Sequence, residues 1–181
     1  LVCLDRDENG LFRLEHELRA HGAGGACAFF LADIRDRLRL RTLFADYRPD
    51  VACHAAAYKH VPVLQHHPLE AVRNNVGGTR NLVELADEHR AGTFVLISTD
   101  KAVNPTSIMG ATKRVAEMYV QALSQRSKTK YVAVRFGNVL GSAGSVVPVF
   151  QQQIAAGGPV KVTHPEMKRY FMTIPEACQL V

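Results

Sequence analysis

Short apolar runs alternate along this chain with stretches in which apolar residues recur every three or four positions. The runs are "LVCLD", "ACAFFLADIRD", "VACHAAAY", "TFVLIST" and "YVAVRFGNVLG". Helical spacing fills the segments between them, at residues 11–21, 37–47, 68–86 and 108–122. Because the runs are nearly continuous, they are typical of parallel strands covered on both faces. The pattern predicts an α/β fold with a doubly wound parallel sheet.

The chain after residue 141 follows a looser order. We expect residues 146–158 to be helical, residues 159–163 to form a strand, and residues 173–181 to begin a helix. No linker or internal repeat divides the sequence. With 181 residues, of which 47% are hydrophobic and 22% charged, the composition suits one globular domain with a core.

The net charge of +5 is unevenly distributed. Residues 1–50 carry eight Lys and Arg against nine Asp and Glu, whereas residues 101–181 carry ten against three. This asymmetry favours an anionic ligand in the C-terminal half. Because no basic run is interleaved with aromatic residues, we expect no nucleic-acid partner and favour a small phosphate-bearing ligand.

Cysteine and histidine positions give no sign of a metal site. The four cysteines are widely scattered, and Cys3, Cys27 and Cys53 lie in apolar runs, which indicates buried, reduced thiols in a cytosolic-type compartment. His66 and His67 are adjacent and, like His60, lack the spacing of metal ligands. No apolar run reaches the length of about 20 residues needed to cross a bilayer, and we see no secretory leader.

Ligands of doubly wound sheets bind beyond the carboxyl ends of the strands, so the residues at those ends are candidates. Asp5 ends the first run, as does the acid that binds the adenosine ribose in dinucleotide folds. That acid normally follows a strand and a glycine-rich loop by about 20 residues, and neither precedes Asp5. We therefore expect a fragment, truncated at both ends. The "GAGG" at 22–25 follows a helix and is interpreted as a helix stop.

Three reactive side chains, Thr99, Asp100 and Lys101, are adjacent where the fourth run ends. Met109 and Lys113 follow on the next predicted helix and, four residues apart, share one of its faces. Taken alone, such a turn is more often a structural cap than a catalytic site.

Four ordered blocks, "HAAAYKHVP", "NNVGGTRNL", "STDKAVNPTSIMGATK" and "VRFGNVLGSAGSVVPVF", resemble the extended short-chain dehydrogenase/reductases. More narrowly, they resemble the nucleotide-sugar 4,6-dehydratases of polysaccharide biosynthesis, which act on UDP-N-acetylglucosamine. The resemblance runs from Leu1 to the last residue and implies a Rossmann-like fold, NAD as cofactor and a homo-oligomer. Large members carry this domain after a transmembrane region, so the full-length protein would be membrane-anchored with its catalytic domain in the cytoplasm.

The resemblance assigns catalytic roles to the residues of the third block. Asp100 is the acid that protonates the departing C6 hydroxyl, Lys101 is the base at C5, and Thr99 holds the C4 oxygen. Burial tends to raise the pKa of a carboxyl and to lower that of a lysine, which suits these roles. Lys113 binds the nicotinamide ribose. Met109 replaces the tyrosine that accepts the first proton in most relatives, so Asp100 or a water held by Thr99 would serve, or the domain is inactive.

The resemblance also assigns a cofactor site and a substrate site. The cofactor residues are Asp5, Arg6, Asp33, Ile34, Ala55, Ala56, Ala57, Tyr58, Asn75 and Lys113. The substrate residues are Lys59, Asn138, Val146, Val147, Lys161 and Arg169. The carboxylate of Asp5 favours NAD over NADP, and Arg6 opposes that preference. Asp5 and Asp33 could equally be a strand-end acid and a helix cap.

These assignments divide the chain into residues 1–145, a dinucleotide-binding region, and residues 146–181, the start of a nucleotide-sugar-binding region. The function expected from the resemblance is an NAD(P)-dependent UDP-N-acetylglucosamine 4,6-dehydratase of surface polysaccharide or lipopolysaccharide biosynthesis, inactive as an isolated fragment. A 4-epimerase of the same fold and a catalytically silent nucleotide-binding module are the alternatives.

Overall fold

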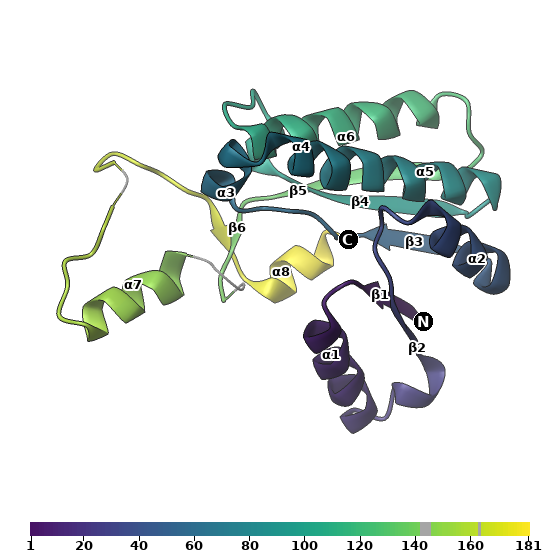
Figure 1. Ribbon diagram of the computed structural model, residues 1–181, viewed down its shortest axis with the longest axis horizontal. Helices are drawn as coiled ribbons and strands as arrows, with labels where there is room; N and C mark the ends of the chain where they lie inside the picture. Colours follow the sequence, from purple (N-terminus) through teal and green to yellow (C-terminus); the bar gives the residue numbers. More distant parts are fainter. Residues whose placement is uncertain (142–145, 163) are drawn as a thin grey trace.

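The computed structural model describes residues 1–141, 146–162 and 164–181 (Figure 1). Its strands are β1 (Val2–Asp5), β2 (Ala28–Leu31), β3 (Val51–His54), β4 (Thr93–Thr99), β5 (Lys130–Phe136), β6 (Asn138–Val139) and β7 (Phe171–Met172). Its α-helices are α1 (Glu8–Ala20), α2 (Arg37–Tyr47), α3 (Val61–His66), α4 (Pro68–Ala71), α5 (Thr79–Glu88), α6 (Ile108–Ser124), α7 (Val146–Ala155) and α8 (Ile174–Gln179). Short 3-10 turns lie at η1 (Gly24–Ala26) and η3 (Asp100–Ala102), and η2 (Val72–Gly78) is a π-helix.

The strands pair in parallel, as the apolar runs predict. β4 lies between β3 and β5, with Leu96 opposite both His54 and Ala133. β1 pairs with β2, and the short β6 pairs with β7. Because all these pairs are parallel, the carboxyl ends within each pair lie at the same edge. This arrangement confirms the α/β class.

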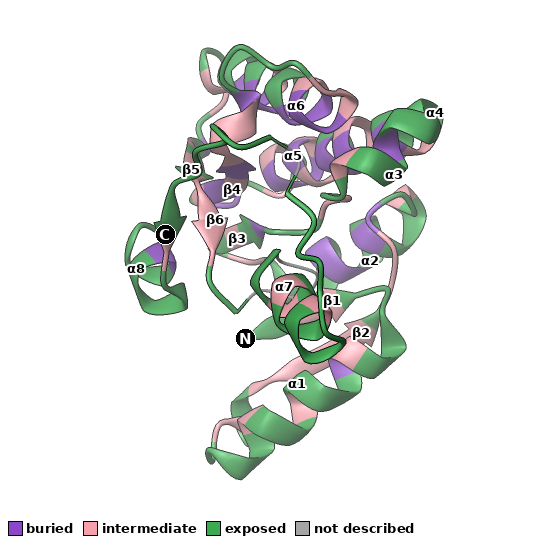
Figure 2. Cartoon of the chain, turned by 90° about the vertical axis from the view of Figure 1, so that its left-hand side faces the viewer, coloured by how far each residue is buried: buried purple, intermediate pink, exposed green. Residues whose placement is uncertain are grey.

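The main core lies between the β3–β4–β5 sheet and the helices α5 and α6, which run across one face of it (Figure 1). Figure 2 shows the buried residues concentrated in these elements. Phe94, Leu96, Val83 and Leu85 are fully buried there. The opposite face is less covered than predicted, since Val51 is 57% exposed.

The cysteine prediction was wrong in part. Cys53 is exposed, because it alternates with the core-facing Ala52 and His54 along β3. Cys3 and Cys27 are half-buried rather than buried. All four cysteines are free thiols.

The long helix predicted from Pro68 is one helical stretch with a π-helical middle, α4–η2–α5. Gly78 lies in its π segment, where a Cβ would come within 2.4 Å of the Ile34 side chain. The glycine therefore allows the helix to approach the residues that follow β2. π-helical turns are frequent at functional sites, and this one carries Asn74 and Asn75.

Helix α6 begins where two side chains cap it. Ser107 accepts a hydrogen bond from the Gly110 amide at 3.1 Å, and Gln65 of α3 accepts one from the Ile108 amide at 2.7 Å. A Cβ on Gly110 would lie 2.3 Å from the Lys101 carbonyl oxygen. The start of α6 is thus packed directly against η3.

The C-terminal segment partly departs from expectation. Helices α7 and α8 form as predicted, but residues 159–162 form no strand, and Thr163 lies outside the described residues. A strand appears instead at β7, which the sequence pattern does not single out because it is two residues long. Helix α3, which was not predicted, is a six-residue helix with Pro62 in its first turn.

Candidate functional site

Two neighbouring clefts lie at the carboxyl ends of the strands. The first, here called the β1 cleft, has a volume of about 230 Å³ and is lined by Leu4, Asp5, Arg6, Ala32, Ile34, Ala55, Ala56, Ala57, Tyr58 and Asn74. The second, here called the β4 cleft, has a volume of about 380 Å³. Its lining includes Lys59, Ser98, Thr99, Lys101, Met109, Lys113, Phe136, Asn138, Val146 and Phe171. Ala55, Ala57 and Tyr58 line both, so the clefts share a wall.

The β1 cleft gathers most of the residues assigned to the cofactor. Asp5 and Arg6 come from the end of β1, and Ile34 from the loop after β2. The three alanines after β3 are small, which leaves room for a ligand to approach the backbone. Asp33 is absent from the lining but reaches it through Arg6, since the Arg6 Nη1 and the Asp33 Oδ2 are 3.7 Å apart.

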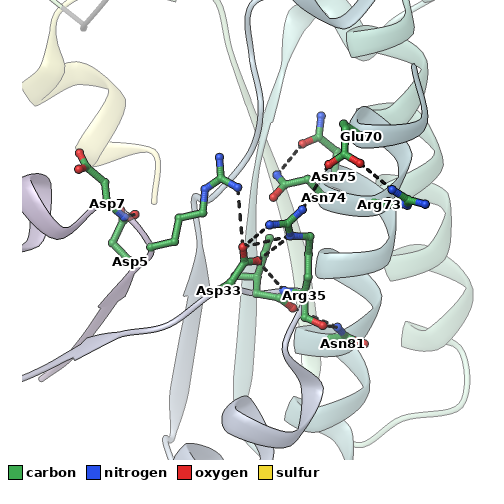
Figure 3. A network of polar contacts seen from close by, with 11 residues as sticks. Asp5, Asp7, Asp33, Arg35, Glu70, Arg73, Asn74, Asn75 and Asn81 are labelled. Atoms are coloured by element: carbon green, nitrogen blue, oxygen red, sulfur yellow. Dashed lines mark hydrogen bonds and ion pairs between the residues drawn. The ribbon is translucent and has the colours of Figure 1, made fainter. Parts of the chain in front are cut away.

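A network of charged groups surrounds Asp33 beside this cleft (Figure 3). The Arg35 guanidinium donates to both carboxylate oxygens of Asp33, with its Nη2 at 2.6 Å and its Nε at 3.0 Å. Arg35 also lies 3.3 Å from Glu70 of α4, which in turn pairs with Arg73. The hydrogen bond from Arg35 lowers the pKa of Asp33 below its ordinary value, so Asp33 stays ionised.

Asn75, which was assigned to the cofactor, lies behind the cleft wall. It is 1% exposed, and its side chain accepts a hydrogen bond from the Tyr58 amide at 2.8 Å and donates one to the Tyr58 carbonyl at 3.0 Å. It also donates to the Thr112 hydroxyl of α6 at 3.1 Å. Asn75 thus fixes the wall shared by the two clefts, and its neighbour Asn74 lines the β1 cleft.

The three adjacent residues of the "STDK" turn form a hydrogen-bonded set at the rim of the β4 cleft. The Thr99 hydroxyl donates to Asp100 Oδ1 at 2.9 Å, and the Lys101 Nζ donates to the same oxygen at 3.0 Å. Lys101 also donates to the side-chain oxygen of Asn138 at 3.0 Å. The geometry brings a carboxylate, an ammonium and a hydroxyl together at the cleft.

The pKa expected for Asp100 was wrong. Burial raises the pKa of this carboxyl, but the hydrogen bonds from Lys101 and Thr99 outweigh burial and bring its pKa below the ordinary value. Asp100 is therefore ionised in this arrangement, with Lys101 Nζ 3.0 Å from its Oδ1.

Lys113 extends from α6 to the floor of the same cleft. Its side chain is buried at 6% exposure, and its Nζ donates to the Ile97 carbonyl of β4 at 2.5 Å. Burial lowers the pKa of Lys113 to about 8, and the Glu117 carboxylate partly opposes that change. Nearby on β3, burial and then the charge of Lys113 lower the pKa of His54 to about 3.

Met109 lines the β4 cleft one turn before Lys113. It is 4% exposed and packs in a small cluster with Leu64 and Ala71. A thioether supplies no acidic proton, so Met109 contributes shape and an apolar surface, not acid–base chemistry.

The assigned substrate residues are only partly brought together. Lys59, Asn138 and Val146 line the β4 cleft, whereas Val147, Lys161 and Arg169 are exposed and outside its lining. Arg169 Nη1 donates to the carbonyl of the neighbouring Lys168 instead.

Sequence reasoning missed an ion pair between a buried carboxylate of α6, Glu117, and an exposed guanidinium of β5, Arg135. Glu117 is 6% exposed and accepts two hydrogen bonds from Arg135 of β5, from Nε at 2.9 Å and from Nη2 at 2.6 Å. Burial raises the pKa of Glu117, but hydrogen bonds and nearby positive charge, of which the hydrogen bond from Arg135 is the largest contribution, bring the pKa below its ordinary value. The available signal was the position of Glu117, four residues after Lys113 on the same helix.

In the part of the chain that the structure describes, no group of three or more His, Cys, Asp or Glu residues is arranged to hold a metal ion. Within the same residues, no helix combines the length and the apolar character needed to cross a bilayer.

Comparison with known proteins places the chain in a family. Residues 1–181, the whole chain, match the family described as "Polysaccharide biosynthesis protein". The chain belongs to this polysaccharide biosynthesis protein family.

The relatives of this chain carry different functional names. The chain is 55% identical to the "Probable polysaccharide biosynthesis protein EpsC" of Bacillus subtilis (strain 168), covering 100% of this chain and 30% of that protein. It is 32% identical to the "UDP-N-acetylglucosamine 4,6-dehydratase (inverting)" of Campylobacter jejuni strain 81-176, covering 100% of this chain and 54% of that protein. It is 34% identical to a "UDP-glucose 4-epimerase" of Rickettsia bellii strain OSU 85-389, over 84% of this chain and 45% of that protein.

Solved structures confirm the fold of this polysaccharide biosynthesis protein. The structure of Pen from Bacillus thuringiensis superposes with a TM-score of 0.90 at 34% identity, covering 99% of this chain and 56% of that one. The dTDP-glucose 4,6-dehydratase DesIV from Streptomyces venezuelae, solved with NAD and TYD bound, matches with a TM-score of 0.84 at 20% identity, covering 98% and 60%. The chain thus has the Rossmann-like fold of the short-chain dehydrogenases and spans about a third to three fifths of the proteins it matches.

Proposed function

We propose that the protein is an NAD-dependent 4,6-dehydratase that converts UDP-N-acetylglucosamine to a UDP-4-keto-6-deoxy-hexosamine in surface polysaccharide biosynthesis. The observation that carries this proposal is the hydrogen-bonded set at the end of β4. Thr99 and Lys101 line the β4 cleft together with Lys113, and Asp100, which is outside that lining, accepts hydrogen bonds from both Thr99 and Lys101. The family and the dehydratase among its relatives support the same reaction. We further propose that residues 1–145 bind the dinucleotide, that residues 146–181 begin the nucleotide-sugar site, and that a larger, membrane-anchored protein holds this domain on the cytoplasmic side.

The described residues fit a dinucleotide. The shared wall at Ala55, Ala57 and Tyr58 would let one extended ligand pass from the β1 cleft into the β4 cleft. Asp5 would bind the adenosine ribose at one end, and Lys113 would bind the nicotinamide ribose at the other. When bound, the nicotinamide would take a hydride from sugar C4 and return it to C6.

The protein's own residues would move two protons, each in two transfers. The C4 hydroxyl would lose its proton through Thr99 to Asp100, which are already hydrogen-bonded. The resulting ketone acidifies the C5 proton, which Lys101 would remove as a neutral amine. Asp100, protonated in the first step, would then protonate the C6 hydroxyl as it leaves as water, and Lys101 would return a proton to C5.

The lowered pKa of Asp100 is compatible with this scheme, because an ionised Asp100 can accept the C4 proton. In the resting arrangement Lys101 Nζ lies 3.0 Å from Asp100 Oδ1 and 3.0 Å from Asn138. To act as the base at C5, Lys101 would release a proton to solvent when the substrate binds, which a substrate group that separates Nζ from Asp100 and Asn138 would favour.

A nucleotide-sugar 4-epimerase is the second candidate, since an epimerase is among the relatives. It needs no acid for C6 and therefore does not explain the Asp100–Lys101 pair. A catalytically silent module is favoured by Met109, which cannot accept a proton.

The test is to incubate the full-length protein with UDP-N-acetylglucosamine and NAD and to analyse the sugar by mass spectrometry and NMR. We expect loss of one water and a 4-keto-6-deoxy product, with turnover reduced at least about 100-fold in Asp100→Asn and Lys101→Ala. Lys128→Ala, which changes an exposed lysine between α6 and β5 outside both clefts, is the control and should retain turnover. A C4-inverted sugar would show an epimerase, and sugar binding without turnover would show a silent module.

A further inference from the structure

The side chain of Arg6 is held at the mouth of the β1 cleft from two sides. Its guanidinium carbon lies 4.4 Å from the centre of the Tyr58 ring, within the range of cation–π attraction. Its Nη1 lies 3.7 Å from Asp33 Oδ2. These contacts direct the charge of Arg6 toward the loop after β2.

Asp33 is in turn fixed by Arg35 in the arrangement of Figure 3. Arg35 donates to both of its oxygens, and its own backbone amide donates to Asp33 Oδ1 at 2.8 Å. Because Arg35 also contacts Glu70, the orientation of the Asp33 carboxylate is set by groups on α4 as well as by its own loop.

The charges at this mouth leave no excess of positive charge for the 2'-phosphate of NADP. Arg6, Arg35 and Arg73 carry three positive charges, and Asp5, Asp33 and Glu70 carry three negative charges. A 2'-phosphate on the adenosine ribose would approach Asp5 and would need a guanidinium to neutralise it. Arg6 is the cation in the cleft lining, and it is directed toward Asp33, with its Nη1 3.7 Å from Asp33 Oδ2.

We propose that Asp33 determines dinucleotide specificity by holding the Arg6 guanidinium against Tyr58, where it does not bind the 2'-phosphate of NADP. This inference rests on the proposed function, since it requires that the β1 cleft bind adenosine. It assigns the preference for NAD to two carboxylates, Asp5 directly and Asp33 through Arg6.

The test measures binding, not turnover. NAD and NADP are titrated separately into the full-length protein by calorimetry, without sugar, for the wild type and for Asp33→Asn. We expect the wild type to bind NAD more tightly, and Asp33→Asn to gain about tenfold in affinity for NADP with less than about a threefold change for NAD. The gain should weaken at high salt, because it comes from one ion pair.

Two further variants show whether the effect passes through Arg6. Asp33→Asn combined with Arg6→Ala should lose the gain for NADP. Glu70→Gln removes a negative charge that contacts Arg35 but not Arg6, so it should leave the ratio of the two affinities within about twofold of the wild type. If Asp33→Asn does not fold, Asp33→Ala in a Glu70→Gln background and Arg6→Ala alone are compared by the same titrations.

The outcomes separate this inference from the proposed function. NAD binding with an unchanged affinity ratio in Asp33→Asn, or a gain that persists without Arg6, would overturn the role of Asp33 and leave the dehydratase proposal standing. Binding of neither dinucleotide by the wild type would overturn both.

Discussion

The buried pair between Glu117 and Arg135 offers a prediction whose size follows from the structure. Removing Arg135 leaves a carboxylate at 6% exposure without its two strongest hydrogen bonds. Breaking a buried ion pair from one side costs about 3–5 kcal/mol. Arg114 remains 3.3 Å from Glu117, and the Arg135 side chain is 40% exposed, so solvent screens part of the interaction. We therefore expect Arg135→Ala to lose about 2–3 kcal/mol of unfolding free energy at pH 7.5.

The same pair predicts how that loss depends on pH. The folded pKa of Glu117 is lowered, so its pairing contributes stability above the unfolded pKa of about 4.3 and loses it as pH falls through the folded pKa. In Arg135→Ala the hydrogen bonds that lower the pKa of Glu117 are lost, so the effect of burial raises that pKa and the buried carboxyl can be protonated. The deficit against the wild type should consequently shrink between pH 7.5 and pH 5.

Urea unfolding of the full-length protein at the two pH values, followed by circular dichroism, measures both effects. Arg114→Ala is the matched control, because Arg114 is about as exposed as Arg135 but contacts the same carboxylate through one hydrogen bond of 3.3 Å, and should cost less than about 1 kcal/mol. Arg135→Ala combined with Glu117→Gln should recover part of the loss. A deficit for Arg135→Ala that equals that of Arg114→Ala, or that grows toward pH 5, would refute this reasoning.

Two other predictions concern the β4 cleft. Gly110→Ala would place a Cβ 2.3 Å from the Lys101 carbonyl oxygen, so we expect η3 to shift and turnover to fall at least about tenfold. Gly25→Ala, where a Cβ meets open space, is the control. An unchanged kcat in Gly110→Ala would contradict this prediction. Because burial lowers the pKa of Lys113 to about 8, the ammonium is lost as pH rises through about 8, and the NAD affinity measured by calorimetry should fall between pH 7 and pH 9. An affinity that stays constant over that range would count against a role for Lys113 in holding the cofactor.

The fold class was predictable from the apolar runs because buried parallel strands differ in pattern from the helices between them. Strand ends and i, i+4 spacing also directed attention to Thr99, Lys101, Met109 and Lys113, which line one cleft in the structure, whereas Asp100 is outside that lining. The roles of these residues remain predictions.

Two features of the site could not be predicted from the sequence, because they depend on hydrogen bonds and on the local helix geometry. The expectation of a raised pKa for Asp100 was wrong, because the hydrogen bonds from its neighbours lower the pKa by more than burial raises it. Asn74 lines the β1 cleft, and Asn75 forms hydrogen bonds with the Tyr58 backbone. Both positions depend on the π-helical turn, which helical periodicity does not distinguish from an α-helix.

The central claim is that Lys101 and Asp100 remove water from a hexose in the β4 cleft. The most direct measurement is to run the reaction of the full-length protein with UDP-N-acetylglucosamine in deuterated water and to locate deuterium in the product by NMR. We expect one deuteron at C5 and the original C4 hydrogen at C6, with no such product from Lys101→Ala. A sugar that retains its C6 oxygen and its C5 hydrogen would contradict the account.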